Sequence, residues 1–271
     1  VQEWLRRPAS STQRADASLL ASRNSRKFDS VTNQVEATSP RRLARIAGLL
    51  YLIIIVAAPF AELFVLSAMV EPGDAAATAA NILGSEQLFR FGGAASLVTV
   101  FCDVALAAIF YELMRPVSRG LALMAAYFRL AAILVVAVNA LTYFAPLAFL
   151  NGEAYAFTVE QLQSLSMLSL RLHTIGYNIA LLIFGGHCLL LGLLIAKSTF
   201  LPRLIGALVV IAGVGYLING FAVFVFPGFA ALLDPYIALP WLAGEGSLAL
   251  WLLIVGLNAE EWRKQAARSR A

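Results

Sequence analysis

Six long apolar segments, joined by polar connections, are the feature that most constrains the fold of this chain. Each is long enough for a helix that crosses the roughly 30 Å hydrocarbon core of a bilayer, which takes about 20 residues. The segments cover residues 44–69, 92–114, 121–149, 174–196, 204–226 and 236–258. Because they are continuously apolar rather than alternating, they favour helices over the strands of a β-barrel. The sequence therefore predicts an all-α integral membrane bundle of about six transmembrane helices.

The composition agrees with a membrane location. Hydrophobic residues make up 60% of the chain and charged residues 13%, against about 25% charged residues in a typical soluble domain. A soluble protein of 271 residues could not bury so much apolar surface in one core. The net charge of +4 comes from basic residues outside the apolar segments, where they act as topology signals. The expected partner is therefore the lipid bilayer, and no nucleic acid is expected.

The positions of Lys and Arg predict the orientation of the chain, because short basic connections stay in the cytoplasm. Basic residues precede the first segment, follow the second, lie between the fourth and fifth, and follow the sixth. They are Arg41, Arg42, Arg45, Arg115, Arg119, Lys197, Arg203, Arg263, Lys264, Arg268 and Arg270. The alternate connections are mainly acidic. Six crossings with both termini in the cytoplasm satisfy this pattern.

The two ends of the chain differ from its apolar middle. Residues 1–40 are polar, without helical periodicity, and are predicted to form a disordered cytoplasmic tail. They lack the apolar stretch of a signal peptide. Because the chain begins with Val, one hypothesis is that translation starts at Val31 and that residues 1–30 are not translated. Residues 41–259 are assigned to the transmembrane domain and residues 260–271 to a basic cytoplasmic C-terminal tail.

Two weaker patterns concern individual segments. Residues 160–172 carry Leu at nearly helical spacing, which predicts an amphipathic helix at the outer interface or an extension of the fourth span. Residues 77–90, which precede the second span, are likewise expected to form an amphipathic helix at the outer interface or an extension of that span. A faint repeat relates the first span, which contains Tyr51, to the fifth span, which contains Tyr216.

Ionisable residues near the middle of the predicted spans need an explanation, because a charge there costs about 2.5–3.5 kcal/mol to insert. Asp103, Arg129 and Glu245 fall near the midplane, and His187 falls near it or slightly inward. Glu62 falls closer to the outer face. Such residues are expected to face the bundle interior, so the first four form a candidate buried polar cluster.

Two acids and one arginine at the midplane allow two interpretations. Arg129 could pair with Asp103 or with Glu245 and only lock the helices together, since a buried ion pair rarely gains free energy over apolar packing. Alternatively, the acid left without a partner could carry a proton or contribute to a binding site for a small molecule. Secondary candidates for hydrogen bonds in such a site are Asn139, His173, Tyr177 and Asn178.

Motifs for metal, cofactor or nucleophile chemistry are missing from the sequence. It has no His-Glu-x-x-His, no P-loop and no dinucleotide fingerprint. His173 and His187 have a spacing that would suit two stacked haems, but each haem needs a second histidine and the chain has only two. Gly244 and Gly246, which flank Glu245, are expected to allow close helix packing rather than to form a nucleophile turn. No catalytic residue, cofactor or metal site is therefore predicted.

A series of short motifs runs along the chain. It includes RIAGLLYLI at 45–53, CDVAL at 102–106, FR at 128–129, FGGHCLLLG at 184–192 and GE at 244–245. Over residues 42–258 this series resembles a bacterial multi-pass membrane protein family, the domain of unknown function 4386. The resemblance implies a protein of the bacterial cytoplasmic (inner) membrane with uncharacterised function. It supplies no catalytic residues.

The sequence leaves three functional hypotheses open. The leading one is a non-enzymatic membrane protein that binds or moves a small solute, a lipid or a proton through the midplane cluster. The second is an intramembrane enzyme that acts on a lipid with an acid and His187. The third is a structural or assembly protein whose charges only fix helix packing. The oligomeric state is not predicted.

Overall fold

The computed structural model describes residues 39–151, 156–233, 236 and 238–269, which are almost entirely helical. The predicted tail at residues 1–40, with Val31, lies outside the described residues except for its last two. The elements are α2 (Pro40–Pro59), η2 (Phe60–Leu66), α3 (Ser67–Met69), α4 (Ala75–Gly84), α5 (Glu86–Met114), α6 (Arg119–Leu150), α7 (Val159–Lys197), α8 (Arg203–Val225), α9 (Pro227–Leu233), α10 (Ala238–Trp241), η3 (Leu242–Gly246), α11 (Ser247–Ile254) and α12 (Ala259–Arg268). The predicted all-α membrane bundle is confirmed.

Within the described part of the chain, five helices are long and apolar enough to cross a membrane, and they correspond to the first five predicted spans. They run over Pro40–Met69, Glu86–Met114, Arg119–Leu150, Val159–Lys197 and Arg203–Val225. Most of these helices begin before the first residue of the apolar segment to which they correspond. The side chains of Ser118 and Thr158 cap two of these starts by accepting hydrogen bonds from backbone N–H groups.

The sixth predicted span, residues 236–258, corresponds to a helix that runs from Ala238 to Ile254. This helix reaches the length of a span only together with α9, across a bend. Among the described residues the structure therefore has five spans, or six if this bent pair counts as one.

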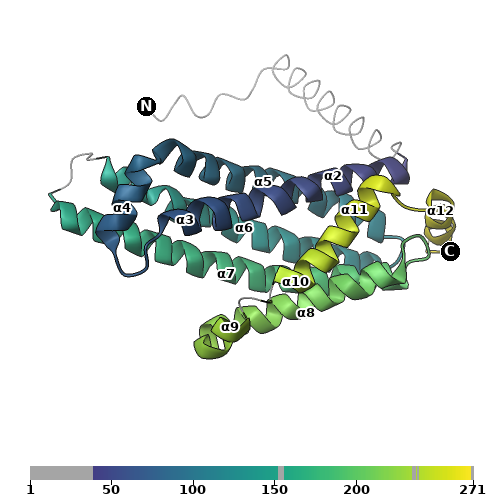
Figure 1. Ribbon diagram of the computed structural model, residues 1–271. Helices are drawn as coiled ribbons and strands as arrows, with labels where there is room; N and C mark the ends of the chain where they lie inside the picture. The colour runs from purple at the N-terminus through teal and green to yellow at the C-terminus, as the bar shows by residue number, and fades with distance from the viewer. Residues whose placement is uncertain (1–38, 152–155, 234–235, 237, 270–271) are drawn as a thin grey trace, which may run out of the picture. The chain divides into compact units, whose positions relative to one another are not determined.

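The long helices of the unit Pro40–Ala271 form a closed series of contacts (Figure 1). α2 packs against α5, α5 against α6, α6 against α7, α7 against α8 and α8 against η3, while α11 returns to α2. Glycine allows the closing contact, because a Cβ on Gly48 would lie 2.8 Å from the carbonyl oxygen of Ala249. Gly192 and Gly206 bring α7 and α8 together in the same way.

Two short π-helical segments interrupt the first and last spans. η2 contains Glu62 and η3 contains Glu245. The π-helix is rare and frequently occurs at functional sites. η3 approaches α8 closely at Gly244, where a Cβ would lie 2.7 Å from the carbonyl oxygen of Leu208. The close packing predicted for this glycine is therefore confirmed.

One end of the bundle includes the long extension of α7. α7 is a single helix of 39 residues, roughly 58 Å long at about 1.5 Å per residue. It is therefore longer than a membrane crossing needs, and its amphipathic part at residues 160–172 extends the fourth span. α4 packs against α7. Residues 77–90 are divided at Ser85 between α4 and α5.

At the opposite end of the bundle, part of the predicted C-terminal tail forms the helix α12 (Figure 1). Asn258 caps this helix, because its side-chain oxygen accepts hydrogen bonds from two backbone N–H groups of the first turn. The indole N–H of Trp262 donates to the carbonyl oxygen of Leu113 at the end of α5, at 2.9 Å. Residues 259–268 are thus a helix docked against the bundle.

Candidate functional site

The four residues of the predicted midplane cluster lie at similar depths in their helices. Counted at about 1.5 Å per residue from the helix end nearer α12, they lie roughly 13–17 Å into the bundle. These residues are Asp103 on α5, Arg129 on α6, His187 on α7 and Glu245 on η3. Arg129 contacts both Asp103 and His187, whereas Glu245 has other hydrogen-bond partners.

Arg129 is the centre of the cluster and is fully buried. Its NH2 nitrogen forms an ion pair with Oδ1 of Asp103, and its NH1 nitrogen lies 2.9 Å from Nε2 of His187. The rings of Tyr51 and Phe184 have centroids 5.0 and 5.1 Å from its Cζ atom, within the range of cation–π attraction. Arg129 therefore pairs with Asp103 rather than Glu245, and it connects α5, α6 and α7.

The hydrogen bonds of His187 define its protonation state. Nδ1 lies 2.8 Å from the backbone oxygen of Ala125, which can only accept, so Nδ1 carries the proton. Nε2 faces the guanidinium of Arg129, which can only donate, so Nε2 accepts. This network assigns the neutral Nδ1–H tautomer to His187. Both of its nitrogens are engaged by the protein.

Glu245 has two tyrosine partners instead of a cation. The hydroxyl of Tyr51 donates to Oε2 at 2.7 Å, and the hydroxyl of Tyr216 donates to Oε1 at 2.5 Å. Glu245 is 7% exposed, and it forms no ion pair with a basic side chain among the described residues. Tyr51 contacts both Glu245 and Arg129, so it connects the two parts of the cluster.

A second polar group lies nearer the end of the bundle at α4, which is called the outer end after its predicted orientation, and joins η2, α6 and α7. Nε2 of His173 lies 3.1 Å from Oε1 of Glu62. Nδ1 of His173 lies 3.1 Å from the side-chain nitrogen of Asn139, a donor, and 3.3 Å from its backbone oxygen, an acceptor. Nδ1 therefore has a partner whether or not it carries a proton. His173 and Asn139, predicted as secondary candidates, belong to this outer group rather than to the midplane cluster.

A cavity of about 690 Å³ is lined by members of both polar groups. Its volume is in the range of small-molecule sites, roughly 300–1,000 Å³. Most of its wall is apolar, and five ionisable acidic or basic side chains are part of it. They are Glu62, Asp103, Arg129, Arg171 and Glu245. The wall thus combines a hydrophobic surface with a few polar groups, as expected of a ligand site.

The other candidate residues divide between the wall and the layer behind it. Tyr177 and Asn178 line the cavity. The wall does not include His187, His173 or Asn139. His187 and His173 each hydrogen-bond to a residue of the wall, and Asn139 hydrogen-bonds to His173. These three residues therefore position the groups that face the cavity.

The ring of helices is open beside the cavity on its outer half. Among the described residues, η2 contacts α2, α3 and α5 but none of α8, α9, α10 and η3. The first and last spans meet on the inner half, where α2 packs against α11. Leu63 of η2 and Leu242 of η3 line the cavity from these two spans, and they are 59% and 58% exposed.

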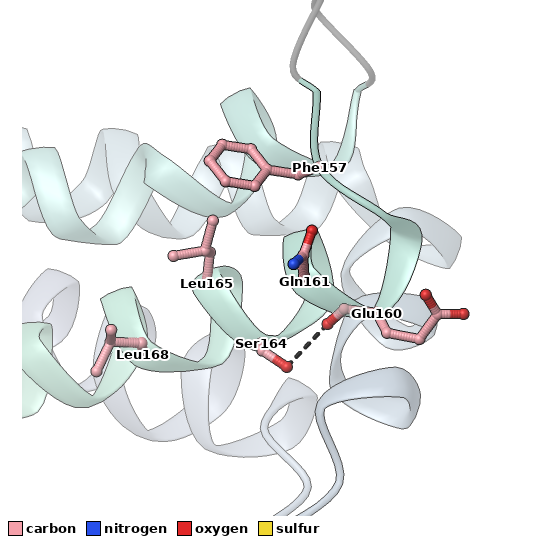
Figure 2. Close-up of a pocket in the computed structure, with 6 residues that line it drawn as sticks. All are labelled: Phe157, Glu160, Gln161, Ser164, Leu165 and Leu168. Carbon is pink, nitrogen blue, oxygen red and sulfur yellow. Dashed lines mark hydrogen bonds between the residues drawn. The ribbon is translucent and has the colours of Figure 1, made fainter.

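Figure 2 shows a second pocket, of about 390 Å³, at the start of α7. The side chain of Phe157 lies above that of Leu165 in this view, and the hydroxyl of Ser164 donates a hydrogen bond to the backbone oxygen of Glu160 within the helix. The remaining lining residues are Gln161 and Leu168. The pocket shares no residue with the larger cavity and includes one ionisable group, Glu160. We therefore assign the candidate site to the larger cavity.

The described residues include no group of three or more His, Cys, Asp or Glu side chains placed to hold a metal ion. His173 and His187 both hydrogen-bond to protein groups. The two cysteines, Cys102 and Cys188, are buried and free.

Comparison with known proteins identifies the family. A family model described as a domain of unknown function, DUF4386, matches residues 46–256. The chain belongs to this family. An uncharacterised protein of Archaeoglobus fulgidus is 31% identical over 162 residues, which cover 60% of this chain and 82% of that protein. No solved structure matches the chain.

The DUF4386 match includes every residue of both polar groups, and the predicted family resemblance is confirmed. Three members of these groups were not predicted as site residues: Tyr51, Glu62 and Tyr216. The faint repeat between the first and fifth spans contained the signal for the two tyrosines, which both bind Glu245. Glu62 was predicted near the outer face, but its contact with His173, 111 residues away, cannot be read from sequence spacing.

Proposed function

We propose that this membrane protein binds a small membrane-soluble solute in the midplane cavity. The observation that carries the proposal is Glu245, a buried carboxylate in the cavity wall without a basic partner among the described residues. Ionisable groups inside a membrane are costly and usually mark a pathway or a binding site. The hydrogen bonds of Glu245 to Tyr51 and Tyr216 join helices, but packing alone does not explain a carboxylate in the wall of a cavity, where a ligand would use it.

The volume of the cavity supports the same conclusion. Helices in membranes associate through close packing, and a void in a packed interior costs about 24 cal/mol per Å³ in soluble proteins. The inner half of the bundle is closely packed, with backbone contact at Gly48 and Gly206. A space of about 690 Å³ beside that packed region is more consistent with a binding site than with a bundle built only for stability.

A structural role fits part of the site. The ion pair of Arg129 with Asp103 and the hydrogen bond of Arg129 to His187 join three helices, as the assembly hypothesis requires. This role accounts for these three residues but for neither Glu245 nor the cavity. We therefore assign the three residues to positioning and Glu245 to binding.

The hypothesis of a lipid-modifying enzyme is not favoured by the geometry. It requires His187 to exchange protons with an acid at a substrate. His187 instead donates to Ala125, accepts from Arg129 and is not part of the cavity wall. Our proposal is therefore binding, or binding coupled to movement across the membrane, without catalysis.

We also propose that both termini face the cytoplasm and that the host membrane is a bacterial cytoplasmic membrane. The argument is the distribution of basic residues. Lys and Arg gather at the start of α2, around the connection from α5 to α6, on both sides of the connection from α7 to α8, and on α12, as the positive-inside rule requires of cytoplasmic segments. α12 contacts the end of α5 and the connection after α7, so these basic segments gather at one end of the bundle, which supports the proposed topology.

Photolabelling tests the proposed binding. A neutral alkyl alcohol that carries a diazirine should label peptides of the cavity wall in detergent-solubilised protein. Replacement of a wall residue, Val136→Trp, should fill the cavity and abolish that labelling. The matched control Val138→Trp, at a position that is 67% exposed on the same helix, should leave it unchanged. Labelling confined to lipid-facing residues, or equal labelling in Val136→Trp, would contradict the proposal.

A further inference from the structure

We infer that the cavity takes a hydrophobic organic cation, whose positive charge lies beside Glu245 and against the rings of Tyr216 and Trp241. This inference rests on the proposed function and names the chemical class of its ligand. It follows from four observations: the charges of the wall, the aromatic rings around Glu245, the apolar remainder of the wall and the position of the opening.

The charges of the wall favour a cation. Asp103 already has Arg129 as its partner, and Glu62 has His173. Arg171, the other basic residue of the wall, is exposed at the outer part of α7. Glu245 is thus the wall carboxylate whose partners, among the described residues, are neutral hydroxyl groups. A bound cation would provide the missing counter-charge for this buried group.

Aromatic rings surround the same position. The ring centroids of Tyr216 and Trp241 lie 6.3 Å apart in a stacked arrangement, and those of Phe184 and Tyr216 lie 5.6 Å apart, edge to face. All three rings line the cavity together with Glu245. The faces of aromatic rings attract cations, tryptophan most strongly, and several rings around one site are a common way to bind alkylammonium groups.

The rest of the wall and the opening determine the body of the ligand. Side chains such as Ile54, Leu66 and Ile133 line the cavity, so a hydrophobic body is favoured. The opening lies between η2 and α10, where Leu63 and the half-buried Trp241 line the cavity from the two spans. A cation with a hydrophobic body partitions into the bilayer and can enter from there.

An anion is the main competitor for the cavity. Nε of Arg129 has no hydrogen-bond partner among the described residues, so an anionic ligand would have one donor to use. However, the guanidinium is 0% exposed and already contacts Asp103 and His187. A comparison of a cation with an anion of similar size therefore decides the sign of the ligand's charge.

Tetraphenylphosphonium and tetraphenylborate provide the test, because they have nearly the same size and shape but opposite charge. Thermal unfolding is followed in a neutral detergent at increasing concentrations of each ion. We expect tetraphenylphosphonium to stabilise the wild type saturably and tetraphenylborate not to do so. Glu245→Gln should weaken the response to the cation about tenfold or more, and Trp241→Leu should also weaken it. The control Glu71→Gln, at an exposed site outside the cavity wall, should respond like the wild type.

Each alternative outcome has a definite meaning. Equal stabilisation of the wild type and Glu245→Gln, or no stabilisation by the cation, would overturn the inference. Stabilisation by tetraphenylborate that disappears in Val136→Trp would overturn the charge assignment but retain the proposed binding function. The wild-type comparison of the two ions decides the sign of charge even if Glu245→Gln does not fold. Failure of the photolabelling experiment would overturn the proposed function separately.

Discussion

At the scale of single residues, Arg129 and Glu245 share Tyr51 as a neighbour but are held in different ways. Arg129 has a carboxylate, an imidazole nitrogen and aromatic rings as partners. Glu245 has two hydroxyl groups. Arg129 forms an ion pair with Asp103 inside the protein, whereas Glu245 has hydrogen bonds but no ion-pair partner among the described residues. This difference is why we assign a positioning role to Arg129 and a binding role to Glu245.

The two tyrosines should therefore be important for stability as well as for binding. Tyr216→Phe removes the hydroxyl that donates to Oε1 of Glu245. We expect the free energy of unfolding to fall by about 1.5–3 kcal/mol, the usual contribution of a hydrogen bond to a charged group. Chemical unfolding in detergent, followed by circular dichroism, measures the change. Tyr127→Phe, at a 61% exposed position, is the control, and equal stability of both variants would argue against a structured Glu245 site.

At the scale of secondary-structure elements, glycine positions determine how closely helices approach. A Cβ on Gly206 would lie 2.8 Å from the backbone oxygen of Gly192, so neither helix can accommodate a larger residue without moving. Most of the helices were predictable, because long apolar segments have few other stable states in a bilayer. The π-helical segments η2 and η3 were not, because the hydrophobic pattern of a span does not record a local change of hydrogen bonding.

Gly206→Val tests the close approach of α7 and α8. The added side chain would overlap the backbone of α7, and we expect a loss of about 1–3 kcal/mol in unfolding free energy, or more. The control is Gly120→Ala, a helical position with no neighbouring atom within 4 Å of an added Cβ. That change should be neutral or stabilise by up to about 1 kcal/mol, because Ala favours helix over Gly. Similar stability of the two variants, by thermal unfolding, would contradict the packing described for this pair.

At the scale of the whole molecule, the sequence indicated four residues at similar distances along their helices but not which of them are partners. Helix order around a bundle is not encoded in hydropathy, so the choice between Asp103 and Glu245 as the partner of Arg129 remained open. The cavity also could not be predicted from the sequence, because its wall combines residues from at least five separate elements. The sixth span was predicted at residues 236–258, and the bend between its helix and α9 was not predicted, because hydropathy does not record a change of helix direction.

The bent pair of α9 and α10–α11 leads to a prediction about the termini. If it crosses the membrane, the chain has an even number of crossings and both termini lie on the same side. A fluorescent protein that folds only in the cytoplasm should then be active when fused after Ala271, and periplasmic alkaline phosphatase should be inactive there. A fusion after Arg119, in a basic connection, is the control for a cytoplasmic signal. An active phosphatase at the C terminus would reduce the number of crossings to five.

The central claim is that Arg129 and Asp103 form the structural pair whereas Glu245 is available to a ligand, and a mutant cycle tests it most directly. Thermal unfolding in detergent is compared for Arg129→Leu, Asp103→Asn, Glu245→Gln and the two double variants that contain Arg129→Leu. We predict that Arg129→Leu loses about 3–5 kcal/mol, because it leaves a buried carboxylate without its partner. Asp103→Asn should restore much of this loss in the double variant, and Glu245→Gln should not. Rescue by Glu245→Gln instead of Asp103→Asn would identify Glu245 as the structural partner and contradict the account.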